Sequence, residues 1–330
     1  MSQTAPLLAG GRAIPVAQAA PVSAEMTMAF EPVIAPHDGL LVRERLFPSQ
    51  MMCGALEKQL VFNVGAWNAA MPDRLEDDAF SPLAGDFVAQ GNPKIFSLRE
   101  EGDCMKRYCC HQWRETTVGL FAEPFSISLG APGSSTAGEI ISGGGWYGNT
   151  PLLEFFRPFQ CTAVVPCAPC WMLNPQVMEV RVPESIATGQ AGASIGRISM
   201  EWKWWNPWWH QMHYTATDGR GAPVYDIEVP NGCTNGFTNC CAPSMCNPIY
   251  SVNIRDATSK LHPIVGTIEN QWPGCNFRGL CLSASAADNY VVKFPPKATP
   301  SEKALLVGAL MLLNFNFFEA RDNQKNNNQG

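Results

Sequence analysis

Two cysteines, Cys167 and Cys170, form a Cys-x-x-Cys pair with prolines beside them, in a stretch that is typical of a loop between strands. This spacing is that of half a structural zinc site, which Cys240, Cys241 or Cys246 would complete. A loop thiol is also an acceptor for thioester lipidation. The ordinary alternative is burial, since cysteine is among the most buried residue types. Lipid attachment, zinc binding and burial therefore remain open for this pair.

The cysteines are expected to be reduced. There are 13 of them, an odd number, and residues 1–21 have no basic start followed by an apolar run. We therefore expect no export, and disulfides rarely persist inside cells.

Tryptophan is concentrated in one short stretch, where five of the ten tryptophans lie within residues 202–209. Tryptophan is favoured at water–lipid interfaces because its ring is apolar and its N–H is polar. We hypothesise that Trp205, Trp208 and Trp209 contact a bilayer. The alternative is that they pack over one end of the fold.

No motif of covalent catalysis is visible. His210 and His213 lack the helix context and the glutamate of a zinc-protease motif. Gly-x-Ser-x-Gly, phosphate-loop and dinucleotide fingerprints are absent from the sequence as well. We expect a protein that is not an enzyme.

Composition excludes several classes of protein. Lys plus Arg is 23 and Asp plus Glu is 29, so the net charge is −6 and no basic stripe for nucleic acid is expected. Apolar residues make up 46%, which is enough for a large core and too many for a disordered chain. No run of 18 uncharged apolar residues exists, so a multi-pass membrane protein is excluded.

The chain ends differ from its body. Residues 1–38 are rich in alanine and proline and predict a disordered arm, either solvated or a docking site for a proline-reading protein module. Residues 323–330 are a polar tail. We expect a single domain over residues 39–322.

Short segments of the body alternate apolar and polar residues with a period of two, which is typical of strands with one buried face. Such segments lie at 125–129, 178–182, 197–201, 225–229 and 250–254. Turn pairs such as Asp218-Gly219 lie between them. Many short strands at this spacing predict a mainly β sandwich or barrel.

One helix is predicted near the C-terminus. Thr299, Pro300 and Glu302 form a capping box with proline at its preferred position, and residues 304–318 are apolar on all sides. Such a helix must be enclosed by protein or lipid. Fifteen residues span roughly 22 Å, short of a hydrocarbon core of about 30 Å.

Protein enclosure fits this helix better than lipid, because Asn314 and Asn316 would find no hydrogen-bond partner in a membrane. A closed antiparallel barrel around the helix would explain both signals. The predicted core-facing residues of the helix are Leu305, Leu306, Leu310, Leu313 and Phe317.

Two stretches resemble one another. A strand, a polar glycine turn, one cysteine and a cysteine pair follow in order at 95–110 and again at 224–241. We interpret this as a pseudo-duplication, with halves of about 41–160 and 161–321.

From residue 151 onward the sequence resembles the phospholipid scramblase family. The similar features are the Arg157-Pro158 strand that leads to Cys161, the cysteine cluster at 167–170, the strands at 176–183 and 195–202, the pair at 240–241, and segments 288–295 and 303–319. The likeness covers about residues 41–322 in order.

The resemblance implies a tubby-like fold, a closed antiparallel barrel of about 12 strands around a central hydrophobic C-terminal helix. It also implies calcium-dependent, bidirectional, ATP-independent movement of phospholipids between leaflets. It further implies attachment to the cytoplasmic face of the plasma membrane, with palmitate on Cys167 and Cys170. A spanning C-terminal helix is commonly assigned to the family.

The resemblance places a Ca²⁺ site at Asp288 and Asn289. Ca²⁺ requires six to eight oxygen ligands, and the family carries acidic residues two before and nine after Asp288. Ala286 and Lys297 occupy those positions here. We expect calcium binding at this segment to be weak or absent.

Two functions of different classes remain after the sequence analysis. One is a lipid translocator, and the other is a non-catalytic membrane-tethered module that binds lipid or protein, as tubby-like proteins do.

Overall fold

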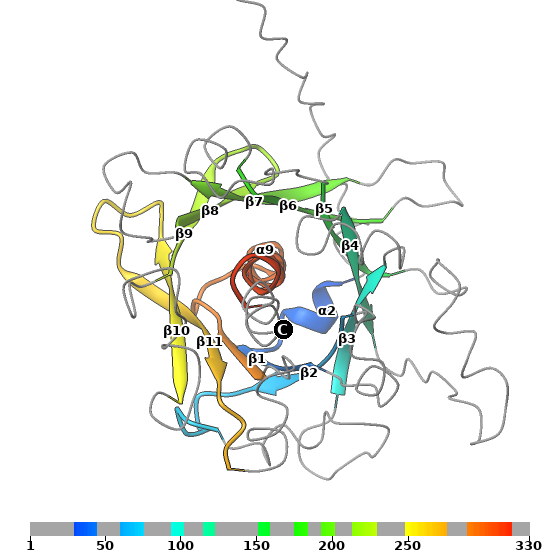
Figure 1. The fold of residues 1–330 in the computed structure, drawn as a ribbon. Coiled ribbons are helices and arrows are strands. Elements are labelled where there is room, and N and C mark those ends of the chain that lie inside the picture. The colour runs from blue at the N-terminus through cyan, green and yellow to red at the C-terminus, as the bar shows by residue number, and fades with distance from the viewer. Residues whose placement is uncertain are drawn as a thin grey trace, which may run out of the picture.

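The computed structural model describes ten segments of the chain, which are residues 30–44, 60–75, 94–101, 115–122, 151–158, 175–183, 193–201, 213–229, 248–275 and 289–318. They form a closed barrel with two helices inside it (Figure 1).

Twelve strands build the barrel wall, and each one pairs antiparallel with its neighbours in the sequence. The ring closes where β1 pairs with β12, with Leu41 opposite Val291. The predicted fold class, a closed 12-strand antiparallel barrel around a C-terminal helix, is confirmed. The strands are β1 (Gly39–Glu44), β2 (Val61–Trp67), β3 (Lys94–Glu101), β4 (Thr116–Ala122), β5 (Leu153–Arg157), β6 (Val177–Arg181), β7 (Ser194–Glu201), β8 (His213–Asp218), β9 (Pro223–Glu228), β10 (Ile249–Asp256), β11 (Ile264–Gln271) and β12 (Asn289–Lys293).

The period-two pattern sets which side chains face the interior. In β10, Tyr250, Val252 and Ile254 are buried in the main core, whereas Ser251 and Asn253 on the other face are half-buried. Successive side chains of a strand point to opposite faces of the sheet, so the alternating sequence specifies the register.

The helix α9 (Pro300–Leu313) runs through the barrel, and the predicted capping box starts it. The Thr299 hydroxyl accepts a hydrogen bond from the Glu302 amide (3.3 Å), and a Glu302 carboxylate oxygen accepts one from the Thr299 amide (2.7 Å). These bonds satisfy two backbone donors that every helix start leaves unpaired.

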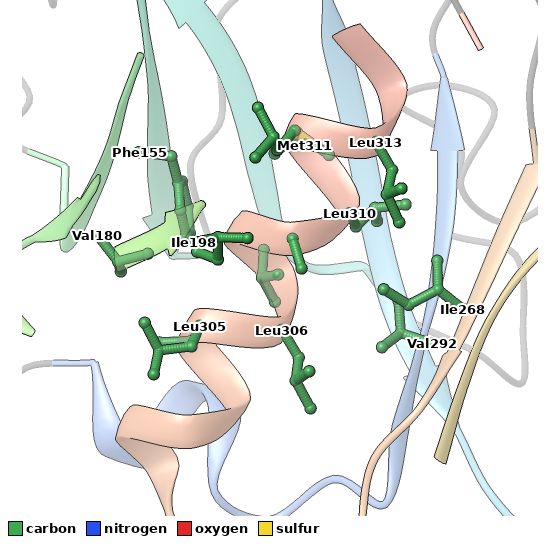
Figure 2. Packing of buried hydrophobic residues seen from close by; sticks show 14 of the residues in the cluster. Phe155, Val180, Ile198, Ile268, Val292, Leu305, Leu306, Leu310, Met311 and Leu313 are labelled. Atoms are coloured by element: carbon green, nitrogen blue, oxygen red, sulfur yellow. The ribbon is translucent and has the colours of Figure 1, made fainter. Parts of the chain in front are cut away.

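A glycine lets α9 approach the wall closely. A Cβ on Gly308 would lie 2.8 Å from Val180, 2.9 Å from Ile198 and 3.2 Å from Phe155. Figure 2 shows these three side chains directed at the helix. The remaining faces of α9 are buried too; the buried residues include Leu305, Leu306, Leu310 and Leu313.

The helix continues as one π-helical turn, η3 (Asn314–Phe318). The side chain of Phe317 lies outside the described part of the structure. Within the described segments, no helix has both the length and the apolar character needed to span a membrane.

A second, short helix, α2 (Glu31–Ile34), corrects the predicted arm boundary at residue 38. Phe30 and Ile34 are fully buried in the barrel core. The prolines of this region suggested an irregular chain, but Pro32 lies in the first turn of α2, where its missing N–H is not needed.

The two ends of the barrel have different edges. We call one the arginine rim, after Arg157; its strand ends are Glu44, Val61, Glu101, Thr116, Arg157, Val177, Glu201, His213, Glu228, Ile249, Gln271 and Asn289. We call the opposite edge the hairpin rim, because the tight connections at 219–222 and 257–263 lie there. The predicted turn pair Asp218-Gly219 lies where β8 ends and the first of these connections begins.

Candidate functional site

The sequence-predicted attachment and metal residues lie outside the described residues, except Asn289. These residues are Cys167, Cys170, Trp205, Trp208, Trp209 and Asp288. Their connections, however, begin and end on one rim. The cysteine connection joins Arg157 to Val177, the tryptophan connection joins Glu201 to His213, and Asp288 directly precedes Asn289. The described strand ends that flank these three connections therefore all lie on the arginine rim.

The barrel interior becomes polar near this rim, whereas deeper positions are apolar. On β10, β11 and β12, Tyr250, Asn270 and Tyr290 lie side by side in register. The buried polar side chains on the inner face near the rim are Glu44, Glu100, Thr116, Arg157, Gln176, Tyr214, Tyr250, Asn270 and Tyr290.

Arg157 lies at the centre of this polar region and is only 1% exposed. Its guanidinium donates hydrogen bonds to Gln176 Oε1 and to Asn316 Oδ1 (3.1 Å). It also lies 5.2 Å from the centroid of the Phe315 ring, within cation–π range. One arginine thus connects β5, β6 and η3.

The two asparagines of the helix end have protein partners. Tyr290 donates its hydroxyl proton to Asn314 Oδ1 (2.6 Å), and Asn316 Nδ2 donates to the Tyr214 hydroxyl (3.4 Å). Buried amides are stable only when hydrogen-bonded. The polar interior therefore supplies the partners that a lipid environment would not.

A buried carboxylate joins the three strands next to β5, where Thr116 lies opposite Arg157 in register. Glu100 accepts hydrogen bonds from the Leu60 amide (3.1 Å) and the Thr116 hydroxyl (3.0 Å). These contacts connect the start of β2 with β3 and β4.

Burial changes the acidity of the interior tyrosines. Desolvation raises the pKa of Tyr214 to about 12, although the Asn316 hydrogen bond and the Arg157 charge act in the opposite direction. Desolvation, with a smaller effect of Tyr214, raises the pKa of Tyr250 to about 12. Both phenols therefore stay neutral to a higher pH than an exposed tyrosine does.

The segment that the family resemblance linked to calcium is divided by a strand. Asn289 starts β12 at the arginine rim and is buried, whereas Lys297 is exposed beyond the other end of β12. Five strand residues span roughly 16 Å, and Ca²⁺ ligands lie within about 2.6 Å of the ion. Side chains at the two ends could not share one ion. Among the described residues, no group of three His, Cys, Asp or Glu side chains could hold a metal.

Sequence reasoning treated Arg157 as a mark of resemblance and missed its position in the interior. The signal was the register of β5, where Leu153 and Phe155 face the core and Arg157 is the next inward position. An arginine at the end of the apolar inner face of β5 indicates a buried hydrogen-bond network. The alternation of apolar and polar residues alone does not reveal it.

The sequence is similar to one family of known proteins. The family model "Scramblase" matches residues 147–320, just over half of the chain. The chain is 24% identical over 233 residues to "Phospholipid scramblase 1" of Homo sapiens, which covers 70% of this chain and 55% of that protein. It is 24% identical over 226 residues to "Phospholipid scramblase 2" of Bos taurus, covering 68% of this chain and 58% of that protein.

The chain spans about half the length of these curated relatives. No solved structure matches it significantly. The family match covers β5 to β12 and α9, so it includes Arg157, Tyr214 and both asparagines of η3. From its sequence, the chain belongs to the scramblase family.

Proposed function

We propose that this protein is a phospholipid scramblase, which moves phospholipids in both directions between bilayer leaflets without ATP. The family match over residues 147–320 is the observation that supports this proposal. Scrambling forms and breaks no covalent bond; it lowers the barrier for a headgroup to cross the apolar layer. No catalytic residue is required, in agreement with the expectation that the protein is not an enzyme.

The helix α9 stays inside the barrel during this activity. Eight large apolar side chains of α9 and η3 are at most 1% exposed; they are Leu305, Leu306, Val307, Leu310, Met311, Leu312, Leu313 and Phe315. Moving α9 out of the barrel would uncover the apolar inner side chains of the wall. Exposure of each large apolar side chain to water costs about 1.5–3 kcal/mol, so several of them would together approach the 5–15 kcal/mol stability of a typical domain. Lipids would therefore move along the outside of the barrel, where it perturbs the bilayer.

Reconstitution tests the activity. The purified full chain in liposomes, without ATP, should equilibrate a headgroup-labelled phospholipid between leaflets within minutes, as read by a membrane-impermeant quencher. Protein-free liposomes and liposomes with heat-unfolded protein are the controls. If the labelled lipid stays in its original leaflet with and without Ca²⁺, the proposal is wrong.

The arginine rim faces the membrane in this proposal, at the cytoplasmic face of the plasma membrane. Palmitate on Cys167 and Cys170 and contact through Trp205, Trp208 and Trp209 would hold it there. Two acyl chains anchor a protein stably where one does not.

Two experiments test these contacts. Hydroxylamine-sensitive acyl labelling should disappear in the double variant Cys167→Ala/Cys170→Ala. Flotation of the protein with liposomes should fall when the three tryptophans are replaced by serine. Wild-type protein that takes up no acyl label would exclude palmitate on the cysteines, and unchanged flotation would exclude bilayer contact through the tryptophans. Zinc bound through the cysteines would support a structural zinc site instead of lipid attachment.

Calcium control is weak in this protein. Ala286 and Lys297 remove or reverse charges that the family pattern carries, and β12 separates the two ends of that segment. Calorimetric titration with Ca²⁺ should show no sub-micromolar site in the wild type. A sub-micromolar site that Asp288→Ala abolishes would contradict this expectation, and Asn289→Asp serves as a comparison variant with one added charge.

The filled interior favours a second candidate function, a membrane-tethered module that binds lipid or protein without transport. Proline-reading protein modules at the N-terminal arm would be its partners. In the reconstitution experiment, such a protein would bind the liposomes and leave the labelled lipid in place.

A further inference from the structure

The helix α9 does not fill the barrel alone. It contacts the wall formed by β5–β8, the strand β12 and the helix α2. Figure 1, which looks along the barrel, shows α9 close to that wall and α2 between α9 and the wall of β3 and β4. A four-residue helix therefore occupies a part of the interior that α9 leaves open.

Burial of apolar side chains is what holds the helix α2 in this place. Its N-cap residue, Phe30, makes no side-chain cap, and the helix has a single full turn. Phe30 and Ile34 are its two fully buried side chains, and Val33 is half-buried. Isolated helices of this length are unstable, so α2 persists because its two apolar side chains fill the barrel.

A buried lysine lies where this segment leaves the interior. Lys303, 8% exposed, donates hydrogen bonds to the carbonyl oxygens of Ala35 (2.8 Å) and His37 (2.7 Å) and lies 5.5 Å from the centroid of the Phe294 ring. Burial lowers the pKa of Lys303, and the nearby charge of Asp38 raises it less. The ammonium group thus has neutral acceptors, although hydrogen bonds to anions are about twice as strong.

A positive charge at the rim and apolar side chains deeper in the barrel match the two parts of an amphiphile, its charged head and its apolar chain. The Phe294 amide donates to the Asp38 carbonyl (2.9 Å), and β1 starts at Gly39, so Lys303 lies at the hairpin rim. Phe30 and Ile34 lie deeper, within the main core. A ligand with a charged head at the rim and one acyl chain beside α9 would match both features.

We propose that residues 30–37 are a displaceable plug of a lipid site, in which one acyl chain replaces Phe30 and Ile34 and an anionic head replaces the two carbonyls at Lys303. Burial of the acyl chain compensates for the loss of these two buried side chains on displacement of the plug. The proposal adds a ligand class to the proposed function, but it requires no transport. The head is a carboxylate or a phosphate, and two probes separate these sources.

The full chain, in solution and without vesicles, is titrated with a fluorescent long-chain fatty acid, a fluorescent lysophosphatidate and a fluorescent fatty alcohol of equal length. The double variant Phe30→Ser/Ile34→Ser weakens the plug and should bind the acidic probes about tenfold more tightly than the wild type, because the binding-competent state is more populated. Lys303→Met in that background should weaken the acidic probes about tenfold and leave the alcohol unchanged. The better of the two acidic probes identifies the head.

Two matched variants control for folding and charge. Leu261→Ser/Ile264→Ser removes two exposed apolar side chains at the hairpin rim, and Lys297→Met removes an exposed lysine near it; neither should change the affinities. Circular dichroism confirms that each variant is folded, and the acidic probes should raise the melting temperature of the double variant more than that of the wild type. Absence of binding by the folded double variant, or equal affinity for the better acidic probe with and without Lys303, would overturn the proposal. Binding without lipid movement in liposomes would instead overturn the proposed scramblase activity alone.

Discussion

Arg157 is the residue on which the polar interior depends. Replacing Arg157 by methionine keeps much of its volume but leaves Gln176 Oε1 and Asn316 Oδ1 without this donor. Each buried acceptor that loses its partner costs about 1–3 kcal/mol, so the free energy of unfolding should fall by at least that amount. Urea denaturation with linear extrapolation measures the change.

Arg181→Met is the matched control for that experiment. Arg181 also pairs with a neighbouring strand, through Glu154 (2.9 Å), but its side chain is one-third exposed. Exposed ion pairs contribute less than about 1 kcal/mol, so this variant should be much closer to the wild type. An equal decrease in the free energy of unfolding for both variants would show that the buried Arg157 network contributes no more stability than the exposed Arg181 ion pair.

The buried tyrosines predict loss of stability at alkaline pH. The pKa of Tyr214 is about 12 in the folded state against 10.0 for a free tyrosine, so the folded protein holds a proton that the unfolded chain releases. The resulting stability is complete below pH 10 and is lost as the pH rises towards 12. Melting temperatures across this range, recorded with phenolate absorbance, should show the decline, and Tyr214→Phe should reduce its slope. An equally steep decline in that variant would contradict the assignment.

At the scale of elements, α9 has no room for a side chain at Gly308. Gly308→Val places methyl groups where Val180, Ile198 and Phe155 already lie. Overpacking of this kind lowers the free energy of unfolding by about 1–3 kcal/mol, so the variant should unfold at a lower urea concentration than the wild type. Ser301→Val, in the half-buried first turn of the same helix, should change stability by less than about 0.5 kcal/mol.

The sequence was sufficient to predict the elements whose local signals agree with their tertiary role. Thr299 and Glu302 start α9 as the capping box predicts, and the alternation at 225–229 and 250–254 matches buried and half-buried faces. The helix α2 could not be predicted, because four residues carry too short a pattern and the interior that stabilises them is built by strands far away in the sequence. The same holds for the partners of Asn314 and Asn316, which come from β5, β8 and β12.

At the scale of the molecule, the barrel and its central helix form one cooperative unit. The core has a single main cluster that combines residues of the wall with α2, α9 and η3. A chain that ends at residue 298 should therefore lose its cooperative thermal transition, because the interior cannot be filled. Removal of residues 323–330 alone should leave the transition unchanged, and calorimetry distinguishes the two. A cooperative transition in the shorter chain would show that the wall folds without its helix.

The two stretches that resemble one another, at 95–110 and 224–241, begin on β3 and β9. These two strands are six positions apart in the ring of twelve and lie on opposite sides of the barrel in Figure 1. This arrangement is what two fused copies of a half-barrel would give. The pseudo-duplication stays a prediction.

The pairing of the first strand with the last has a consequence for how the protein is made. A nascent chain leaves the ribosome from its N-terminus, so β1 waits with an unpaired edge until β12 has been synthesised, and α9 follows later still. Open strand edges and apolar inner faces are where newly made chains aggregate. Folding is therefore largely post-translational, and we expect expression of this protein to depend on chaperones that shelter unfinished chains.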